Sequence, residues 1–131
     1  MTDRELLNLA KTASEFAYAP YSRFSVGAAL ECRDGSIYTG CNVENAALGS
    51  TMCAERIAIY KAVSEGKRDF RRIAIYGGSG EFCMPCGACR QVMSEFSETM
   101  EVLCARDTGS YVSYKLCELL PHTFVFREGK F

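Results

Sequence analysis

Charge of one sign and long apolar runs are both missing from this sequence. Fifteen Lys and Arg residues stand against sixteen Asp and Glu in 131 residues, which gives a net charge of −1. A chain without a basic excess lacks the electrostatic footprint of nucleic-acid or anionic-membrane binding, so we expect neither partner. No apolar run approaches the ~20 residues of a membrane span, and residues 1–11 predict an amphipathic helix, not an export signal. We therefore expect a cytoplasmic globular protein.

Histidine is also scarce, whereas cysteine is abundant. His122 is the single histidine and lies in a predicted loop, while the chain has eight cysteines. Without an export signal, such cysteines are expected to be buried side chains, metal ligands or catalytic groups, not disulfides. Four of them lie within apolar strand or helix patterns and are predicted to be small buried side chains: Cys32, Cys41, Cys104 and Cys117.

Hydrophobic periodicity and turn signals divide the chain into helices and strands. A capping-box pattern at Thr2 and Glu5 opens a helix predicted over residues 3–18. Further helices are predicted over residues 53–66, 86–96 and 115–120. Strands are predicted over residues 26–32, 36–43, 73–76, 102–105 and 111–114, with a hairpin turn at Asp34-Gly35.

The order of these elements predicts the fold class. An opening hairpin followed by helical crossovers requires a mixed sheet, because a crossover connects parallel strands. The prediction is an α/β fold, a three-layer αβα sandwich with roughly five strands, formed as a single domain over residues 1–131. The aromatic tail, residues 124–131, would pack on this sheet, or else contact another subunit or donate a residue to its site.

Three cysteines have the spacing of a metal site. Cys86 and Cys89 are three residues apart at a predicted helix start, which places both thiols on one face of the helix. Cys53 stands at the start of the preceding helix, where the positive end of the helix dipole favours a thiolate. Three thiolates suit tetrahedral Zn²⁺ and leave a fourth position open, which is the arrangement of a catalytic site.

Two residues beside Cys53 complete this pattern. Glu55 is well placed to face the open metal position and to carry protons, while Arg56 could offset the negative charge of the thiolates. A ligand-x-Glu sequence followed by Pro-Cys-x-x-Cys is the signature of zinc-dependent deaminases. Cys53-Ala54-Glu55 and residues 85–89 match it, with cysteine in the histidine position.

Other interpretations of these residues stay open at the level of sequence. Cys83 extends the motif to Cys-x-x-Cys-x-x-Cys, but the further cysteine and proline of an iron–sulfur motif are missing. Cys83 could also be the fourth ligand of a structural zinc in a non-enzymatic binding module. Arg56 could form an ordinary surface ion pair, and Asn42 and Glu44 could simply cap a strand end.

Over nearly its whole length the chain resembles the cytidine deaminase family, specifically its short homotetrameric zinc-dependent members. The resemblance is carried by residues 24–30 (FSVGAAL), 40–46 (GCNVENA), 53–56 (CAER) and 85–91 (PCGACRQ), and by Leu119-Leu120-Pro121 followed by Phe124. It implies hydrolytic deamination of cytidine and deoxycytidine to uridine and deoxyuridine in pyrimidine salvage, with one zinc ion per subunit.

The resemblance also implies roles for single residues. Asn42 and Glu44 would bind the sugar 3′-hydroxyl, with Ala46 in the same substrate loop, and the Ala54 backbone would hold the base edge. Phe24 would pack on the pyrimidine, and Phe124 would be donated by a neighbouring subunit.

One position departs from the family pattern. Members commonly carry Tyr where this chain has Leu48, and leucine cannot donate the hydroxyl bond of tyrosine. The contacts on the sugar side are therefore expected to differ, which leaves a related substrate such as blasticidin S as the alternative to cytidine.

Overall fold

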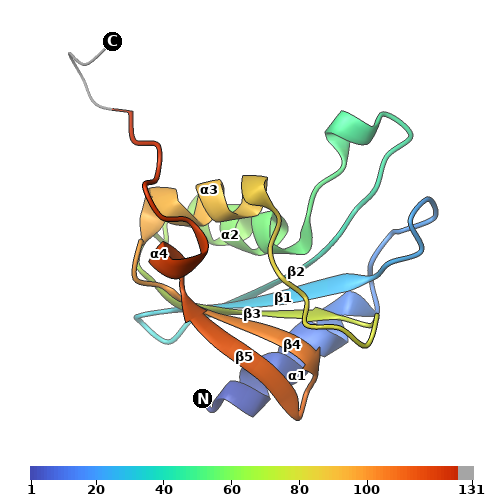
Figure 1. Ribbon diagram of the computed structural model, residues 1–131, viewed down its shortest axis with the longest axis horizontal. Coiled ribbons are helices and arrows are strands. Elements are labelled where there is room, and N and C mark those ends of the chain that lie inside the picture. The colour runs from blue at the N-terminus through green and yellow to red at the C-terminus, as the bar shows by residue number, and fades with distance from the viewer. Residues whose placement is uncertain (127–131) are drawn as a thin grey trace.

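The computed structural model describes residues 1–126 and contains a five-stranded sheet with helices on both faces (Figure 1). The strands are β1 (Val26–Cys32), β2 (Ile37–Cys41), β3 (Phe70–Gly77), β4 (Glu101–Asp107) and β5 (Ser110–Lys115). The helices are α1 (Asp3–Ser14), α2 (Ala54–Ser64), α3 (Gly87–Phe96), α4 (Leu116–Leu119) and the short 3₁₀ helix η1 (Leu48–Ser50). The predicted tail over residues 124–131 lies partly outside the described residues.

The sheet is mixed, as predicted, with strand order β2-β1-β3-β4-β5. β1 pairs antiparallel with β2 through the hairpin at Asp34-Gly35, and it also pairs antiparallel with β3. β3 and β4 are parallel and are joined by α3, whereas β4 and β5 form a second antiparallel pair. The crossover through α2 therefore runs from β2 over β1 to β3, so only the α3 crossover joins parallel neighbours.

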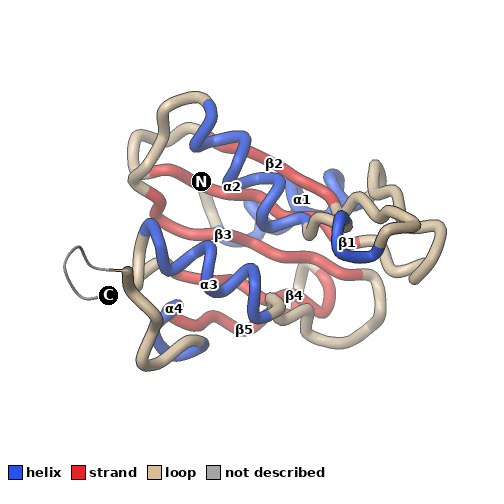
Figure 2. Tube along the Cα trace, turned by 90° about the horizontal axis from the view of Figure 1, so that it is seen from above, coloured by secondary structure: helices blue, strands red, loops and turns tan. Residues whose placement is uncertain are grey.

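Helices cover the sheet as two separate layers, which confirms the three-layer prediction. α1 lies on one face, while α2 and α3 lie side by side on the other (Figures 1 and 2). Strand alternation explains the division, because successive side chains point to opposite faces. In β1, Ala29 packs with Leu6 and Leu7 of α1, whereas Ala28 and Leu30 belong to the core beneath α2 and α3.

The first helix is shorter than predicted. Its capping box is present, since Thr2 and Glu5 exchange side-chain-to-backbone bonds, but it ends at Ser14, not at residue 18. Beyond it, Tyr18 N donates to Asn42 O at 3.0 Å and Glu44 N donates to Tyr18 O at 2.8 Å. This strand-like pairing ends the helix, and Phe16, which lies within the predicted range 3–18, is outside the helix and 76% exposed.

Smaller corrections concern helix starts and cysteines. Cys53 and Cys86 are N-caps, so α2 and α3 begin one residue later than predicted and Pro85 lies just outside α3. Cys32 and Cys104 are buried as predicted. Cys41 is half-buried and Cys117 is exposed, so the prediction of burial is wrong for Cys117.

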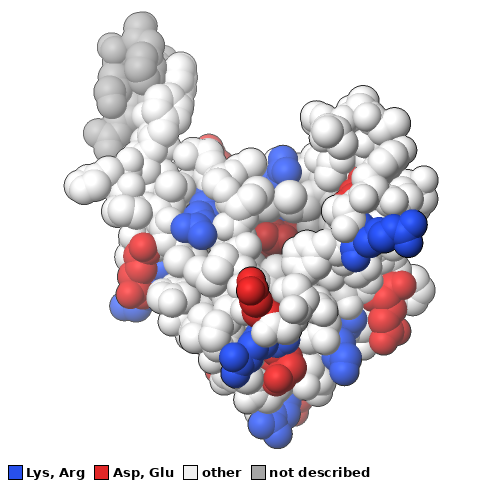
Figure 3. Space-filling view, turned by 45° about the vertical axis from the view of Figure 1, so that its right-hand side comes forward, with Lys and Arg blue, Asp and Glu red and all other residues white. Residues whose placement is uncertain are grey.

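Surface properties agree with the balanced composition. Lys and Arg side chains are interspersed with Asp and Glu on the face shown in Figure 3. Within residues 1–126, none of the helices has both the length and the apolar character needed to cross a bilayer.

Close packing between α1 and β1 requires a glycine at position 27. A Cβ atom there would lie 1.8 Å from Ala10 O and 2.5 Å from Ser14 N. Gly27→Ala is therefore expected to lower the free energy of unfolding by about 3 kcal/mol or more, because backbone atoms of α1 would have to move. Chemical denaturation measures this loss. Gly78→Ala is the matched control, since nothing lies within 4 Å of its Cβ position, and an equal loss in both variants would contradict the packing argument.

Candidate metal centre and active site

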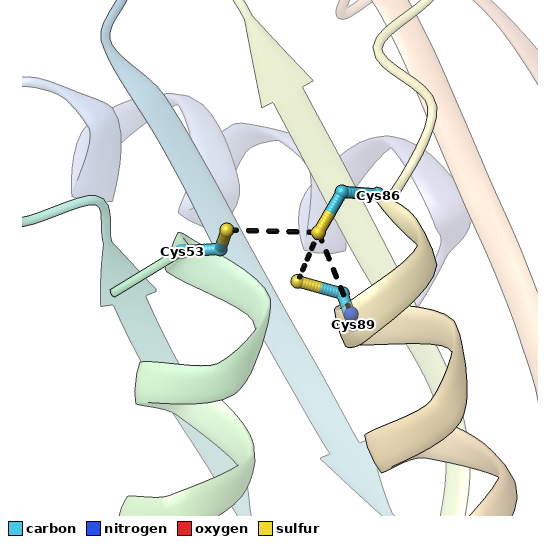
Figure 4. A group of neighbouring side chains, drawn as sticks. All are labelled: Cys53, Cys86 and Cys89. Carbon is cyan, nitrogen blue, oxygen red and sulfur yellow. Dashed lines mark hydrogen bonds between the residues drawn. The ribbon is translucent and has the colours of Figure 1, made fainter. Parts of the chain in front are cut away.

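The N-termini of α2 and α3 bring three cysteine sulfurs together (Figure 4). Cys53 caps α2, Cys86 caps α3 and Cys89 lies in the first turn of α3. The Sγ atoms of Cys53 and Cys86 are 3.8 Å apart, and those of Cys86 and Cys89 are 3.4 Å apart. All three sulfurs lie within 4.8 Å of one another. The sequence-predicted trio is therefore gathered from two segments more than thirty residues apart.

This sulfur cluster fits a zinc ion. Tetrahedral zinc with Zn–S bonds near ~2.3 Å separates its sulfurs by about 3.8 Å, close to the distances between these thiols. In the described part of the chain, Cys83 does not belong to the cluster. Burial raises the pKa of the Cys83 thiol to about 12. The geometry thus favours three protein ligands over the four-sulfur alternatives.

Arg56 contacts the cluster directly, and it forms no ion pair with any acidic residue in the described range 1–126. Its Nη2 donates to Cys53 Sγ at 3.3 Å. The Cys89 thiol and then the Arg56 guanidinium lower the pKa of Cys53 to about 5, so both groups stabilise the Cys53 thiolate. Hydrogen bonding to that thiolate raises the pKa of Cys89. Zinc binding displaces protons from such thiols, and the guanidinium offsets the resulting negative charge.

Glu55 lies beside the sulfurs in the first turn of α2 and is 4% exposed. Burial raises the pKa of its carboxyl group to about 7. A carboxyl group of this kind can both accept and release a proton near neutral pH, which is what general acid–base catalysis requires.

A cavity of about 240 Å³ opens next to the cluster and Glu55. Four of the residues expected to contact substrate line it: Phe24, Asn42, Glu44 and Ala54. Ala46 and Phe124, as placed within residues 1–126, do not. The cavity also has lining residues that the sequence did not single out for substrate: Ser22, Val26, Thr51, Cys83 and Met84. Val26 lies within the residues 24–30 motif, and the only signal for Ser22 was its position two residues before that motif.

Asn42 and Glu44 hold the chain segment that carries Phe24. Asn42 Oδ1 accepts from Val26 N at 2.9 Å, and its Nδ2 donates to Phe24 O at 2.8 Å. Glu44 Oε1 accepts from Tyr21 N and Ser22 N, each at 3.0 Å. The capping role considered from the sequence is therefore present, and both side chains also face the cavity.

Two apolar segments stand away from this cavity. Leu48 is 75% exposed in η1, on the loop that projects from the body of the molecule (Figure 1). Phe124 is 62% exposed, and its carbonyl accepts from Gln91 Nε2 of α3 at 3.3 Å. Neither segment closes the cavity of its own chain.

Three sulfurs at paired helix N-termini beside a buried carboxyl group, on an αβα sheet, define the class of zinc-dependent deaminases. The model of the cytidine and deoxycytidylate deaminase zinc-binding region matches residues 1–105. The chain belongs to the cytidine and deoxycytidylate deaminase family, which confirms the resemblance seen in the sequence.

Individual relatives agree over almost the whole chain. The cytidine deaminase of Sporosarcina psychrophila is 46% identical, covering 95% of this chain and 92% of the relative. That of Halalkalibacterium halodurans is 47% identical over 93% of this chain and 94% of its own. The crystal structure of cytidine deaminase from Burkholderia pseudomallei has a TM-score of 0.91 at 46% identity, covering 95% of this chain and 100% of that one.

The cluster predicts which cysteines hold zinc. Cys89→Ala is expected to reduce bound zinc from about one ion per chain to a small fraction of that, because two thiolates cannot hold the ion tightly. Cys83→Ala is the matched control and is expected to keep its zinc. Metal analysis of the purified variants by plasma mass spectrometry measures both. Loss of zinc from the Cys83→Ala variant would contradict the three-ligand site and would support the alternative of a structural zinc held by four sulfurs.

Proposed function

We propose that this chain catalyses the hydrolytic deamination of cytidine and deoxycytidine to uridine and deoxyuridine, with release of ammonia. One observation carries the proposal: Cys53 and Cys86 of the three-sulfur cluster line the same cavity as the buried Glu55. Cys53, Cys86 and Cys89 would hold one zinc ion, which supplies Lewis-acid activation of water and needs no redox partner. The whole chain would act as one catalytic domain.

Glu55 would carry the protons of the reaction. A carboxyl group with a pKa raised by burial to about 7 can take a proton from the attacking water and deliver it to N3 of the base. It can then take the remaining proton from the oxygen that has bonded to C4 and deliver it to the departing amine, so that the C4–N bond breaks and ammonia leaves. Arg56, already bonded to Cys53, would balance the charge of the sulfurs throughout.

The other lining residues would bind the nucleoside. Phe24, 38% exposed at the cavity, offers an aromatic face to the pyrimidine, and the Ala54 backbone at the α2 N-terminus can hold the base edge. The Asn42 amide would donate a hydrogen bond to the sugar 3′-hydroxyl and the Glu44 carboxylate would accept one from it, with Ala46 in the same loop.

Completion of each cavity would require neighbouring subunits. The exposed aromatic Phe124 and the projecting Leu48 loop lie apart from their own cavity and present apolar surface that a second copy could contact. We therefore propose a homotetramer in which Phe124 enters a neighbour's site. A cytoplasmic location is part of the same proposal, because all eight cysteines, which lie within residues 1–126, are free.

Leu48 is the reason to consider a second substrate. An apolar, exposed side chain at this position removes a hydroxyl donor from the sugar side, which favours tolerance of a modified sugar such as that of blasticidin S. Nucleic acid is disfavoured, because a strand requires a positive track and the net charge is −1.

Activity and its dependence on Glu55 test the proposal together. Ammonia release is expected from cytidine and deoxycytidine, with slower turnover of free cytosine and blasticidin S. Glu55→Gln is expected to lower kcat by roughly 10²–10⁴-fold while zinc stays bound, because it removes the proton carrier but none of the sulfurs. Zinc content and ammonia are measured on the same samples. A zinc-loaded wild type that releases no ammonia from any of the four would instead indicate a binding module.

The proposal of shared active sites predicts the mass of the assembly and the effect of a Phe124 substitution on KM. Light scattering after size exclusion is expected to give four times the chain mass of 14.5 kDa. Phe124→Ala is expected to raise KM about tenfold or more, because an aromatic contact with substrate is lost. Phe16→Ala, which removes another exposed aromatic outside the cavity, is the control. A monomeric wild type with full activity would refute sharing.

A further inference from the structure

Ser22 forms a bridge between the two sides of the cavity. Its Oγ donates to Glu44 Oε2, and the same Oγ accepts from Phe24 N at 3.0 Å. Ser22 itself lines the cavity together with Phe24 and Glu44. One hydroxyl group thus connects the residue expected to face the base with the residue expected to face the sugar.

The direction of the two bonds follows from their partners. The backbone N–H of Phe24 can only donate, so the hydroxyl oxygen accepts there and its own hydrogen is left for Glu44. Glu44 is ionised, since the Ser22 hydroxyl and the Ser22 and Tyr21 backbone N–H groups lower the pKa of its carboxyl group. A hydroxyl with both of these partners has no other stable orientation.

These bonds determine which oxygen of Glu44 is left for a ligand. Oε1 already accepts two backbone N–H groups, from Tyr21 and Ser22. From residues 1–126, Oε2 accepts only the Ser22 hydroxyl, and a carboxylate oxygen can accept two hydrogen bonds. A ligand hydroxyl can therefore use the free acceptor position on Oε2. The two backbone N–H groups and the Ser22 hydroxyl together fix the orientation of the Glu44 carboxylate plane.

The backbone between Ser22 and Phe24 has an unusual conformation that allows the Ser22 hydroxyl to contact both Phe24 N and Glu44. Arg23, between Ser22 and Phe24, has φ 58°, a left-handed conformation that is uncommon for a residue with a side chain. Arg23 N donates to Ala19 O at 3.0 Å, and Asn42 holds the chain on the other side at Phe24 O. The segment is thus held in a conformation that local preference alone does not favour.

We propose that Ser22 is a positioning residue for sugar recognition: its hydroxyl orients Glu44 so that Oε2 accepts the sugar 3′-hydroxyl, and holds that acceptor at a fixed place relative to Phe24. This rests on the proposed cytidine deamination. Ser22 acts through Glu44, and its removal leaves the sulfur cluster and Glu55 untouched.

A pair of substrates that differ by one hydroxyl tests this role. Deoxycytidine has the 3′-hydroxyl and 2′,3′-dideoxycytidine lacks it, while both have the same base. Ser22→Ala is expected to raise KM for deoxycytidine about tenfold, with little change in kcat, and to leave kcat/KM for dideoxycytidine within about twofold. Ser22→Thr, which keeps the hydroxyl, is expected to restore the wild-type values.

Matched variants separate positioning from stability. Ser36→Ala removes the same type of bond, from a serine hydroxyl to Asp34, in the exposed β1–β2 turn, and is expected to leave both substrates unaffected. If Ser22→Ala does not fold, Ser22→Cys supplies a weaker donor of similar size and is expected to give a smaller loss, again only with deoxycytidine. Ser22→Ala in the Glu44→Gln background is expected to add little further loss.

Contrary outcomes fall into distinct classes. An equal loss with both substrates would show that Ser22 does not act through Glu44, and would overturn the proposal. A wild type that treats the two substrates alike would overturn both the Glu44 sugar contact and the part of Ser22 in it, while deamination stands. Absence of ammonia from cytidine itself would refute the proposed function.

Discussion

The repulsion that three thiolates would exert on one another around a zinc ion is the constraint on which the rest of the site depends. Thiolates held within 4.8 Å of one another are stable only where positive charge meets them. The fold supplies this charge from the N-termini of α2 and α3, and Arg56 adds a guanidinium at 3.3 Å from Cys53 Sγ. A divalent cation held by the three sulfurs would supply the remaining positive charge, so the protein and the metal would stabilise the same arrangement of sulfurs.

Sheet topology explains why two helix N-termini meet. β2 and β3 both run antiparallel to β1, so they point the same way, and α2 and α3 follow them along the chain. Each helix returns across the same face of the sheet, as Figure 2 shows, and both therefore begin at the same edge. Ligand sites in α/β proteins generally form at this edge, beyond the carboxyl ends of strands. Here the intervening antiparallel β1 sets the separation between the two crossovers.

Local chemistry made much of this predictable from sequence. Cys86 and Cys89 are neighbours on any helix, and Glu55 follows Cys53 within one turn, so their grouping needed only that two helix starts meet. The end of α1 was not predictable, because it depends on Tyr18 pairing with Asn42 and Glu44, contacts that no local pattern encodes. The same holds for Ser22, whose bond to Glu44 spans twenty-two residues.

Asn42 and Glu44 show that a capping role and a binding role are compatible. The Asn42 amide uses one acceptor position on Val26 N and one hydrogen on Phe24 O, and an amide has another of each. Glu44 likewise keeps an acceptor position on Oε2. Bonds to the backbone immobilise these side chains before a ligand arrives, so binding costs little side-chain entropy. The bonds that cap the strand end are therefore also what would make the two residues effective toward a sugar.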